Sequence, residues 1–440
     1  MTPELPRKLG LIDSLAIVVG MIIGGGIFVV PNLVARNLSS GAAILGIWIF
    51  AGVVSLFGAL ACAELGTAIP ATGGQYVFLR EAFGPMVGFL YGWAMFLVGR
   101  TAQVSWLAVT LALYVSYFVP LSPVESKLLG AAAIVVLAAV NYRGVRAGAV
   151  VQNSFTLAKV AGLLVIVGSA LFYRGHPSAA AAGAPSFSIA NAGVALIACL
   201  LAYDSWVSVS FVAGEIKNPQ RNVLLALVLG MGICIAIYFL ANAAYLHVLA
   251  IPEIAASDHV GASAAERVLG SAGGTLVSVI ILFSIVGTLN GSFLTSPRIY
   301  FAQARDGLFF HQFGGVHERF QTPAFSIVAQ AAWSLVLLVS GTYESLADYA
   351  LFALWIFYGF MILGLIVLRH KRPELARPYR MWGYPVTPVL FLAVTVWFLV
   401  NTLVTRPIPA LAGLAFIVSG VPVYFVWRSR PAEKSAAAGT

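Results

Sequence analysis

A succession of apolar stretches is the feature that most constrains the fold of this chain. About twelve of them are long enough to cross roughly 30 Å of hydrocarbon as a helix that rises about 1.5 Å per residue. The sequence therefore predicts an all-α integral membrane protein with 12 transmembrane helices. These are expected near residues 11–35, 42–69, 86–119, 126–140, 149–173, 190–214, 223–250, 272–303, 323–341, 346–369, 385–404 and 408–428.

The composition supports this class and argues against several others. Of 440 residues, 60% are apolar and 9% are charged, whereas soluble domains are about a quarter charged. The net charge of +9 comes from residues scattered through short loops, so no nucleic-acid surface is expected. Neither an enzyme motif nor a metal-ligand spacing of Cys or His is present. No catalytic residue, metal or cofactor is predicted.

The loops differ in positive charge between the two sides of the membrane. Of the 25 lysines and arginines, two lie within apolar stretches and five in the loops on one side, which leaves 18 on the other. The five are Arg36, Lys127, Arg174, Arg267 and Arg406. By the positive-inside rule, both termini are expected in the cytoplasm. The alanine-rich stretch 178–185 and residues 253–272 are expected to be outer loops, the latter with a short helix around 264–269.

Two interruptions at mid-depth divide the first and sixth stretches. The first is the glycine triplet at Gly24, Gly25 and Gly26; the second is the segment 202–205 (AYDS). Gly25 and Asp204 lie about 179 residues apart, as expected of two repeats whose broken helices meet at a substrate site. An unwound helix exposes amide and carbonyl groups, which complement the carboxylate and ammonium of a free amino acid.

Lys159 is a lone ammonium in the apolar run 155–171. A charge at bilayer depth costs at least roughly 2.5 to 3.5 kcal/mol on insertion scales, so it must face a polar interior and indicates a functional site.

Eight short motifs, in order along nearly the whole chain, together resemble the amino acid, polyamine and organocation transporter superfamily, and most of all its L-type amino acid transporter branch. The motifs are residues 23–31 (IGGGIFVVP), 70–76 (PATGGQY), 140–145 (VNYRGV), 151–159 (VQNSFTLAK), 202–206 (AYDSW), 213–222 (AGEIKNPQRN), 287–292 (GTLNGS) and 369–378 (RHKRPELARP).

The resemblance implies a single transporter domain over residues 1–440 with a five-plus-five inverted repeat of the LeuT type. The repeats would occupy about 11–173 and 190–369, with discontinuous helices 1 and 6, and two further helices would follow at about 385–428. It also implies alternating access, and often obligatory exchange, for an amino acid.

Carried over residue by residue, the resemblance places the substrate carboxylate on the amides of Gly25 and Gly26, beside Gly24. The ammonium would meet carbonyls of Ile22, Leu201 and Asp204. Gly20 is expected only to allow close helix packing. Relatives commonly carry an aromatic residue where this chain has Leu201.

Other residues around the second interruption could complete the pocket. Ala202 and Tyr203 belong to the interrupted segment, and Tyr203, Trp206 or Trp355 could replace the missing aromatic cap. A packing role or a position facing the lipid is the alternative for the two tryptophans. Asp204 could cap the second half-helix, which is the favoured reading, or it could carry a proton or contact substrate.

Lys159 matches a lysine that occupies the cation site of sodium-coupled relatives of the fold, so sodium dependence is not expected. Its donors are predicted to bridge the Gly24 carbonyl to the hydroxyl of Thr288 or Ser292, which share one helical face. Burial disfavours the charged form of a lysine, so Lys159 could instead titrate in a proton symporter. Exchange is favoured from the resemblance.

The remaining polar candidates lie farther from the interruptions. Arg100 could attract anionic side chains, but it is expected mainly to pair near the vestibule. Glu64 and Glu215 are expected to form inner gate or structural pairs with Arg298 or Lys217. Asn290 is expected to order the eighth span.

Neutral amino acids of small to medium size are the expected substrates, carried across a prokaryotic plasma membrane. The loop 119–127 lacks the cysteine through which eukaryotic relatives join a glycoprotein heavy chain, so no such partner is expected. The alternatives are an amine or polyamine antiporter, a non-transporting amino acid sensor and a channel.

Overall fold

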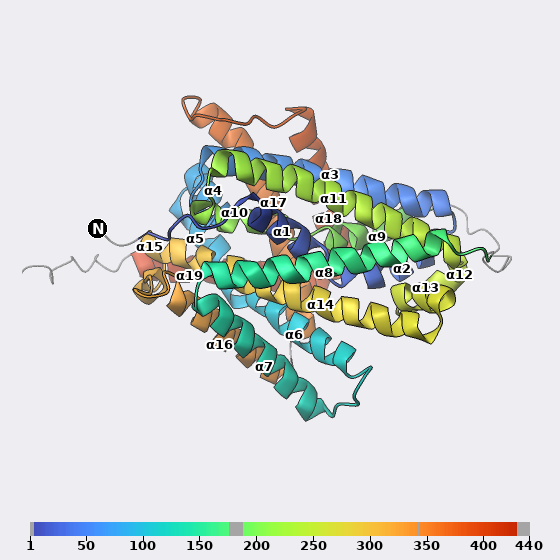
Figure 1. Cartoon of the computed structure of the whole chain (residues 1–440). Coiled ribbons are helices and arrows are strands. Elements are labelled where there is room, and N and C mark those ends of the chain that lie inside the picture. The colour runs from blue at the N-terminus through green and yellow to red at the C-terminus, as the bar shows by residue number, and fades with distance from the viewer. Residues whose placement is uncertain (1–3, 176–187, 342, 429–440) are drawn as a thin grey trace, which may run out of the picture.

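The computed structural model describes residues 4–175, 188–341 and 343–428, and this part of the chain is almost entirely helical (Figure 1). The only β pairing within it is an isolated bridge between Leu9 and Ile216. The elements, in chain order, are α1 (Leu11–Ile22), α2 (Gly26–Asn37), α3 (Gly41–Ala68), α4 (Gln75–Phe83), α5 (Pro85–Ala94), η1 (Met95–Gly99), α6 (Arg100–Val115), α7 (Pro123–Tyr142), α8 (Val145–Leu171), α9 (Ile189–Ala202), α10 (Ser208–Phe211), η2 (Ala213–Glu215), α11 (Pro219–Val248), α12 (Ile251–Ala256), α13 (Val260–Leu269), α14 (Ser271–Thr295), α15 (Pro297–Arg305), η3 (His311–Gly314), α16 (Ala324–Ser340), α17 (Tyr343–Lys371), α18 (Val386–Thr405) and α19 (Pro407–Arg428).

The prediction of an all-helical membrane protein is confirmed. Ten helical segments of the described chain are long and apolar enough to cross a bilayer, with α1–α2, α5–η1–α6 and α14–α15 each counted as one segment. The other two predicted stretches are shorter apolar helices, α9 with 14 residues and α16 with 17. α9 is short because the chain leaves the helical path after Ala202, inside the predicted span 190–214.

The two interrupted segments lie within the bundle. α1 packs against α8, α11 and α14, while α2 packs against α9. α3 runs along α11, and α8 runs along α14, so long helices surround the interruptions (Figure 1). The two interruptions, where the backbone lacks regular helical hydrogen bonds, therefore lie inside the bundle.

The segment after α11 contains two short helices, where one was predicted near 264–269. α12 and α13 both contact α2. The side chain of Asn32 donates to the carbonyl of Ser257, and Arg36 Nε donates to the carbonyl of Ala255 (2.8 Å). These bonds fasten α2 to the connecting segment. The predicted outer loop at 178–185 lies outside the described residues.

The N-terminal segment and the end of α19 lie at the same end of the bundle (Figure 1). The Leu9 amide donates to the carbonyl of Glu215 (3.0 Å), and the Lys217 amide donates to the carbonyl of Leu9 (2.8 Å). These bonds draw the N-terminal segment across the chain that follows α10.

Candidate functional site

The first predicted interruption is present between α1 and α2. α1 ends at Ile22, the chain is non-helical at residues 23–25, and α2 begins at Gly26. A helix end leaves its last four carbonyls without intrahelical donors, and groups buried in a membrane need other partners. The Gly24 amide turns back to the Ile22 carbonyl (2.7 Å). Neighbouring helices supply further donors.

Lys159 of α8 is fully buried and is one of these donors. Its Nζ lies 2.9 Å from the carbonyl oxygen of Gly20, 2.8 Å from that of Ile23 and 3.0 Å from that of Ser284. The Ser284 hydroxyl also donates to the Ile23 carbonyl (2.8 Å), and Thr288 Oγ1 to the Gly20 carbonyl (3.2 Å). An ammonium and two hydroxyls thus fasten the end of α1 to α8 and α14.

The predicted partners of Lys159 are therefore wrong. Lys159 bonds to the carbonyls of Gly20 and Ile23 rather than to that of Gly24, and neither the Thr288 hydroxyl nor the Ser292 hydroxyl is among its partners. Thr288 lies beside Lys159 only in the sense that both donate to the Gly20 carbonyl. Ser292 lies eight residues, about 12 Å, beyond Ser284 along α14. Its hydroxyl donates instead to the Thr288 carbonyl within the helix (3.1 Å).

The second predicted interruption follows α9. Residues 203–207 form turns, and Ser205 has a φ of 79°, which is uncommon for a residue with a side chain. The Asp204 carboxylate accepts hydrogen bonds from the Tyr358 hydroxyl on α17 (2.7 Å) and from Ser205 Oγ (3.2 Å). Side chains therefore hold this interruption in place.

The capping role favoured for Asp204 is wrong. α10 is a four-residue helix that begins at Ser208, and its N-cap position, Val207, makes no side-chain capping bond. Asp204 lies four residues before the start of α10, and its carboxylate is directed to Tyr358 instead.

The two interruptions meet each other. A Cβ built on Gly26 would lie 3.2 Å from the Cα of Ala202, so a larger residue at either position would push the segments apart. The Tyr238 hydroxyl of α11 lies 2.9 Å from the carbonyl oxygen of Ile22 and 3.0 Å from that of Ala202. Tyr238 thus bridges the ends of both first half-helices. The sequence analysis missed it, and the available signal was a tyrosine within an apolar span, because buried tyrosine hydroxyls need partners.

Space is open beside the glycine triplet. A Cβ built on Gly25 would meet no atom within 4 Å, although Gly25 is only partly exposed. The amides at the start of α2 point along the positive end of the helix dipole. Leu201 is also half-buried. Gly20, in contrast, is packed as predicted: a Cβ there would lie 2.2 Å from Thr156 Oγ1.

The three aromatic candidates lie in packed surroundings. The Tyr203 ring contacts those of Trp48 and Tyr238, with centroids 6.0 and 4.8 Å away. Trp206 stacks on Tyr358 at 5.0 Å. Trp355 stacks on Phe398 of α18 at 4.3 Å. The structure thus brings Tyr203 and Trp206 to the second interruption and Trp355 to the α17–α18 interface.

Arg100 follows a π-helical turn at residues 95–99 and is fully buried. Its Nη1 donates to Gln103 Oε1 (3.1 Å), and its guanidinium lies 5.3 Å from the ring centroid of Phe211 in α10. Nε and Nη2 have no hydrogen-bond partner among the described residues. Arg100 therefore lies against the element that continues the second interruption.

Asn290 joins α14 to two neighbouring helices. Its Nδ2 donates to the carbonyl of Gly148 and to Gln152 Oε1, both at 3.0 Å, and its Oδ1 accepts from Asn141 (2.9 Å). Gln152 in turn donates to the Ala16 carbonyl of α1 (3.3 Å). Asn290 is thus positioned to order α14 through a buried polar network.

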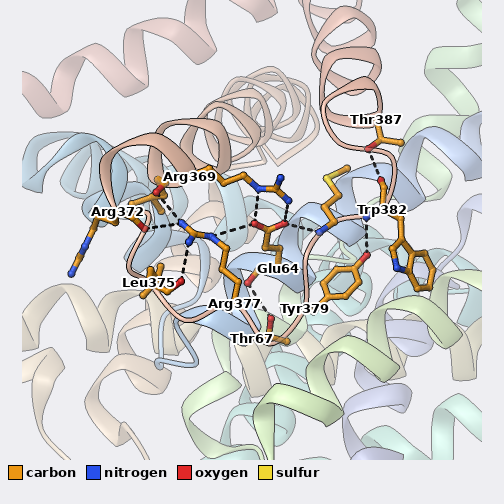
Figure 2. Close-up of polar contacts among 11 residues, drawn as sticks. Glu64, Thr67, Arg369, Arg372, Leu375, Arg377, Tyr379, Trp382 and Thr387 are labelled. Carbon is orange, nitrogen blue, oxygen red and sulfur yellow. Dashed lines mark hydrogen bonds and ion pairs between the residues drawn. The ribbon is translucent and has the colours of Figure 1, made fainter.

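The acidic candidates lie near the end of the bundle that carries the N-terminus. Glu215 and Arg298 form a buried, two-bond ion pair at 2.7 and 3.0 Å, as expected. Glu64 pairs with neither Arg298 nor Lys217. It pairs with Arg369 and Arg377 (Figure 2). Arg369 belongs to the last turn of α17 and Arg377 to the α17–α18 connection, so both come from a part of the chain more than 300 residues from Glu64.

Comparison with known proteins adds independent information. The Amino acid permease family matches residues 9–426. The human b(0,+)-type amino acid transporter 1 is 35% identical, with 97% of this chain and 89% of the relative covered. The serine/threonine exchanger SteT of Bacillus subtilis (strain 168) is 33% identical over 98% of both chains. The human cystine/glutamate transporter is 31% identical over 97% of this chain and 87% of its own.

The family match covers nearly the whole described chain, and all three relatives are named as transporters or exchangers of amino acids. No cluster of three or more potential metal-ligating His, Cys, Asp or Glu residues occurs in the described ranges. The chain therefore belongs to the amino acid permease family of the amino acid, polyamine and organocation superfamily, whose members are multi-pass membrane transporters and not enzymes.

Proposed function

We propose that this protein exchanges neutral amino acids across the plasma membrane, independently of sodium, by alternating access. The observation that carries the proposal is the meeting of two interrupted helices, at Gly26 and Ala202, beside the open space at Gly25. Amides of the first interruption and carbonyls of the second would face a substrate there, which suits a zwitterion.

The proposed scaffold is a single domain with twelve spans. Spans one to ten would form two inverted repeats, at about 11–173 and 190–369, and α18 and α19 would be appended. The matched positions of the interruptions in the first and sixth segments support this arrangement. α9 and α16 would serve as the two shorter spans.

The substrate carboxylate would bind the amides of Gly25 and Gly26, where α2 begins and the helix dipole favours negative charge. The ammonium would bind carbonyls of the second interruption, at Leu201 and Asp204. The Ile22 carbonyl already accepts from Gly24 and Tyr238, and the Leu201 carbonyl accepts from the Asp204 amide (3.2 Å), so the substrate would compete with these donors.

Lys159 supports exchange over sodium or proton coupling. Its three bonds go to carbonyl oxygens, the ligands that a bound cation would take. An ammonium has three N–H donors for three acceptors, whereas a neutral amine would turn its lone pair toward one carbonyl oxygen. The proposed role of Lys159 is therefore a permanent, structural cation.

Neutral substrates fit the charges near the interruptions. The Asp204 carboxylate is engaged by Tyr358 and Ser205. The Arg100 guanidinium lies against the Phe211 ring and donates to Gln103. Leu201 offers a smaller cap than an aromatic ring, which suits small to medium aliphatic side chains. We assign Trp206 and Trp355 to packing around this pocket.

The inner side of the proposed site is covered in this conformation. The Gly73 amide donates to the Phe211 carbonyl (2.8 Å), Leu9 pairs with Ile216, and Glu215 pairs with Arg298. We propose that these contacts form the inner gate. The distribution of basic residues supports cytoplasmic termini, and the cysteine-free loop at 119–127 supports function without a heavy chain.

Uptake of labelled alanine into proteoliposomes tests the proposal. Vesicles are loaded with unlabelled alanine or left empty, and sodium and proton gradients are imposed separately. We expect uptake only into loaded vesicles, with no response to either gradient. Uptake into empty vesicles driven by an inward proton gradient would establish symport instead, and a sodium requirement would contradict the role given to Lys159.

A further inference from the structure

Glu64 lies near the end of α3 and is almost fully buried. Arg369 Nε and Nη2, at 2.8 and 2.5 Å, grip its carboxylate with two bonds. The Met381 amide donates to the same group (2.6 Å), and Arg377 Nε lies 3.5 Å away (Figure 2). One carboxylate thus joins α3 to the last turn of α17 and to two points of the connection that follows.

The two arginines also organise the connection itself. Arg377 Nη2 donates to the carbonyls of Leu368 (2.9 Å) and Arg372 (3.0 Å), which belong to the end of α17 and its continuation. The Arg369 guanidinium lies 3.8 Å from the ring centroid of Tyr384, just before α18. We call Glu64, Arg369, Arg377 and the Met381 amide the Glu64 cluster. Because Glu64 is buried and each arginine makes further contacts, the cluster is a defined ion-pair site and not an isolated surface contact.

The same two helices hold the second interruption farther along their length. On α3, a Cβ built on Gly52 would lie 3.0 Å from the Tyr203 ring, and one on Gly58 would lie 2.6 Å from the Trp206 ring. On α17, Tyr358 bonds to Asp204 and stacks on Trp206. Residues 203–206 thus lie packed between α3 and α17.

Helix geometry relates the two regions. Tyr358 precedes Arg369 by eleven residues, about 16 Å along α17, and Gly58 precedes Glu64 by six residues, about 9 Å along α3. Glu64 is thus too far along the helices to touch an amino acid at Gly25. It can act on the interruption only by fixing the spacing of the two helices that grip it.

We propose that Glu64 is a positioning residue for transport. Its cluster holds α3 against α17, and the spacing of these two helices fixes the position of residues 203–206 between them during the exchange cycle. The inference rests on the proposed exchange function. A bidentate arginine–carboxylate pair supplies both strength and fixed geometry, and removal of the carboxylate leaves two arginines near each other without their counter-ion. The interruption then loses its defined spacing while the substrate-contacting groups remain in place.

Two quantities measured on the purified full-length protein in parallel test this role. One is the dissociation constant for alanine, and the other is the maximal rate of alanine exchange in loaded proteoliposomes. For Glu64→Gln we expect the maximal rate to fall more than tenfold, with the dissociation constant changed less than threefold. Glu64→Asp keeps the charge and should recover part of the rate.

Glu81→Gln is the matched control, because Glu81 pairs with Arg372 (2.6 Å) and Arg80 (2.8 Å) but lies on α4 and is partly exposed. Its rate should stay within twofold of wild type. Should Glu64→Gln fail to accumulate, Arg369→Lys, which keeps the charge but loses the two-bond grip, should show the same separation of rate from affinity.

A double-mutant cycle measures whether Glu64 and Tyr358 act together, which a general loss of stability would not show. If Glu64 and Tyr358 act through the same grip, Glu64→Gln combined with Tyr358→Phe should be little slower than the slower single variant. Multiplicative effects would overturn the inference. So would a wild-type rate in Glu64→Gln, or a loss of affinity as large as the loss of rate. Wild-type protein that binds alanine without exchanging it would overturn the proposed function and this inference with it.

Discussion

The two interrupted helices are held in opposite ways. At the first, three glycines leave the backbone bare, and donors from other helices, chiefly Lys159, bind the exposed carbonyls. At the second, the chain keeps its side chains. Asp204 accepts from Tyr358, Ser205 occupies a left-handed conformation, and Trp206 stacks on Tyr358. Among the side chains that the structure describes, only Tyr238 bonds to both.

The difference indicates which charged group of an amino acid, the carboxylate or the ammonium, each interruption is suited to bind. The first interruption offers amides at the start of a twelve-residue helix. Its Ile23 carbonyl is already bound by the ammonium of Lys159. The second is followed by a helix of only four residues, so it offers little dipole for an anion and is better suited to present carbonyls. The first interruption should thus govern carboxylate binding, and the second should govern movement.

Lys159 provides the most severe test of the first interruption. Replacement by methionine should lower exchange by more than about 100-fold, because three buried carbonyls lose a charged donor, hydrogen bonds to charged groups contribute about 1.5–3 kcal/mol each, and about 2.7 kcal/mol corresponds to that factor. The measurement is alanine exchange in proteoliposomes, with thermal stability recorded separately. Lys371→Met, at an exposed lysine, is the control. Wild-type exchange in Lys159→Met would show that the first interruption needs no cation.

Gly25→Leu tests the assignment of the carboxylate. The leucine side chain should fill the open space beside Gly25 and raise the alanine dissociation constant by about 100-fold, comparable with the loss of a well-placed charged hydrogen bond. Gly46→Leu is a matched control, since a Cβ there also meets nothing within 4 Å but the residue is exposed on α3. Unaltered affinity in Gly25→Leu would remove the carboxylate from this position.

Tyr358→Phe probes the second interruption alone. It removes the bond to the Asp204 carboxylate and keeps the ring that stacks on Trp206. A hydrogen bond to a charged group contributes about 1.5 kcal/mol at the low end, so exchange should slow about tenfold with little change in affinity. Tyr424→Phe, a buried tyrosine that packs on Phe89, serves for comparison. A change in affinity without a change in rate would reverse the roles given to the two interruptions.

The smallest effect concerns the support of α2 by α12 and α13. Hydrogen bonds from Arg267, and then from the Ala250 amide, hold the pKa of Glu253 below its ordinary value of 4.5. Because the folded-state pKa is lowered, the bond stabilises the fold above pH 4.5, and this contribution is lost as the pH falls through the folded-state value. The thermal midpoint of Arg267→Gln should lie slightly below that of wild type at pH 7, and the two should converge in acid. A difference that persists below pH 3 would assign the effect to packing instead.

The sequence was sufficient to predict the helical class and the positions of both interruptions, and the Glu215–Arg298 pair is one of the combinations that it left open. Those features depend on local patterns: a glycine triplet, a polar run inside an apolar span, and charges near helix ends. The partners of Lys159 could not be predicted, because the rotation and offset of α14 against α1 decide whether Ser284 or Ser292 faces the ammonium. The bridge through Tyr238 likewise depends on where α11 packs.

Glu64 was placed at the correct end of the bundle but with the wrong partners. Its carboxylate meets Arg369 in the last turn of α17 and Arg377 in the connection that follows, and no periodic pattern marks where that connection returns toward α3. Asp204 was misread for a related reason. A residue before a half-helix is a natural capping candidate, yet Tyr358 arrives from a helix more than 150 residues away, and its hydroxyl takes the carboxylate.

The most direct test of the central claim is an experimental structure of the protein with alanine bound. The account predicts density for the amino acid between the two interruptions, with its carboxylate within hydrogen-bond distance of the Gly25 and Gly26 amides and its ammonium facing carbonyls of residues 201–204. Alanine bound elsewhere, or first and sixth segments wound continuously through the membrane, would contradict it.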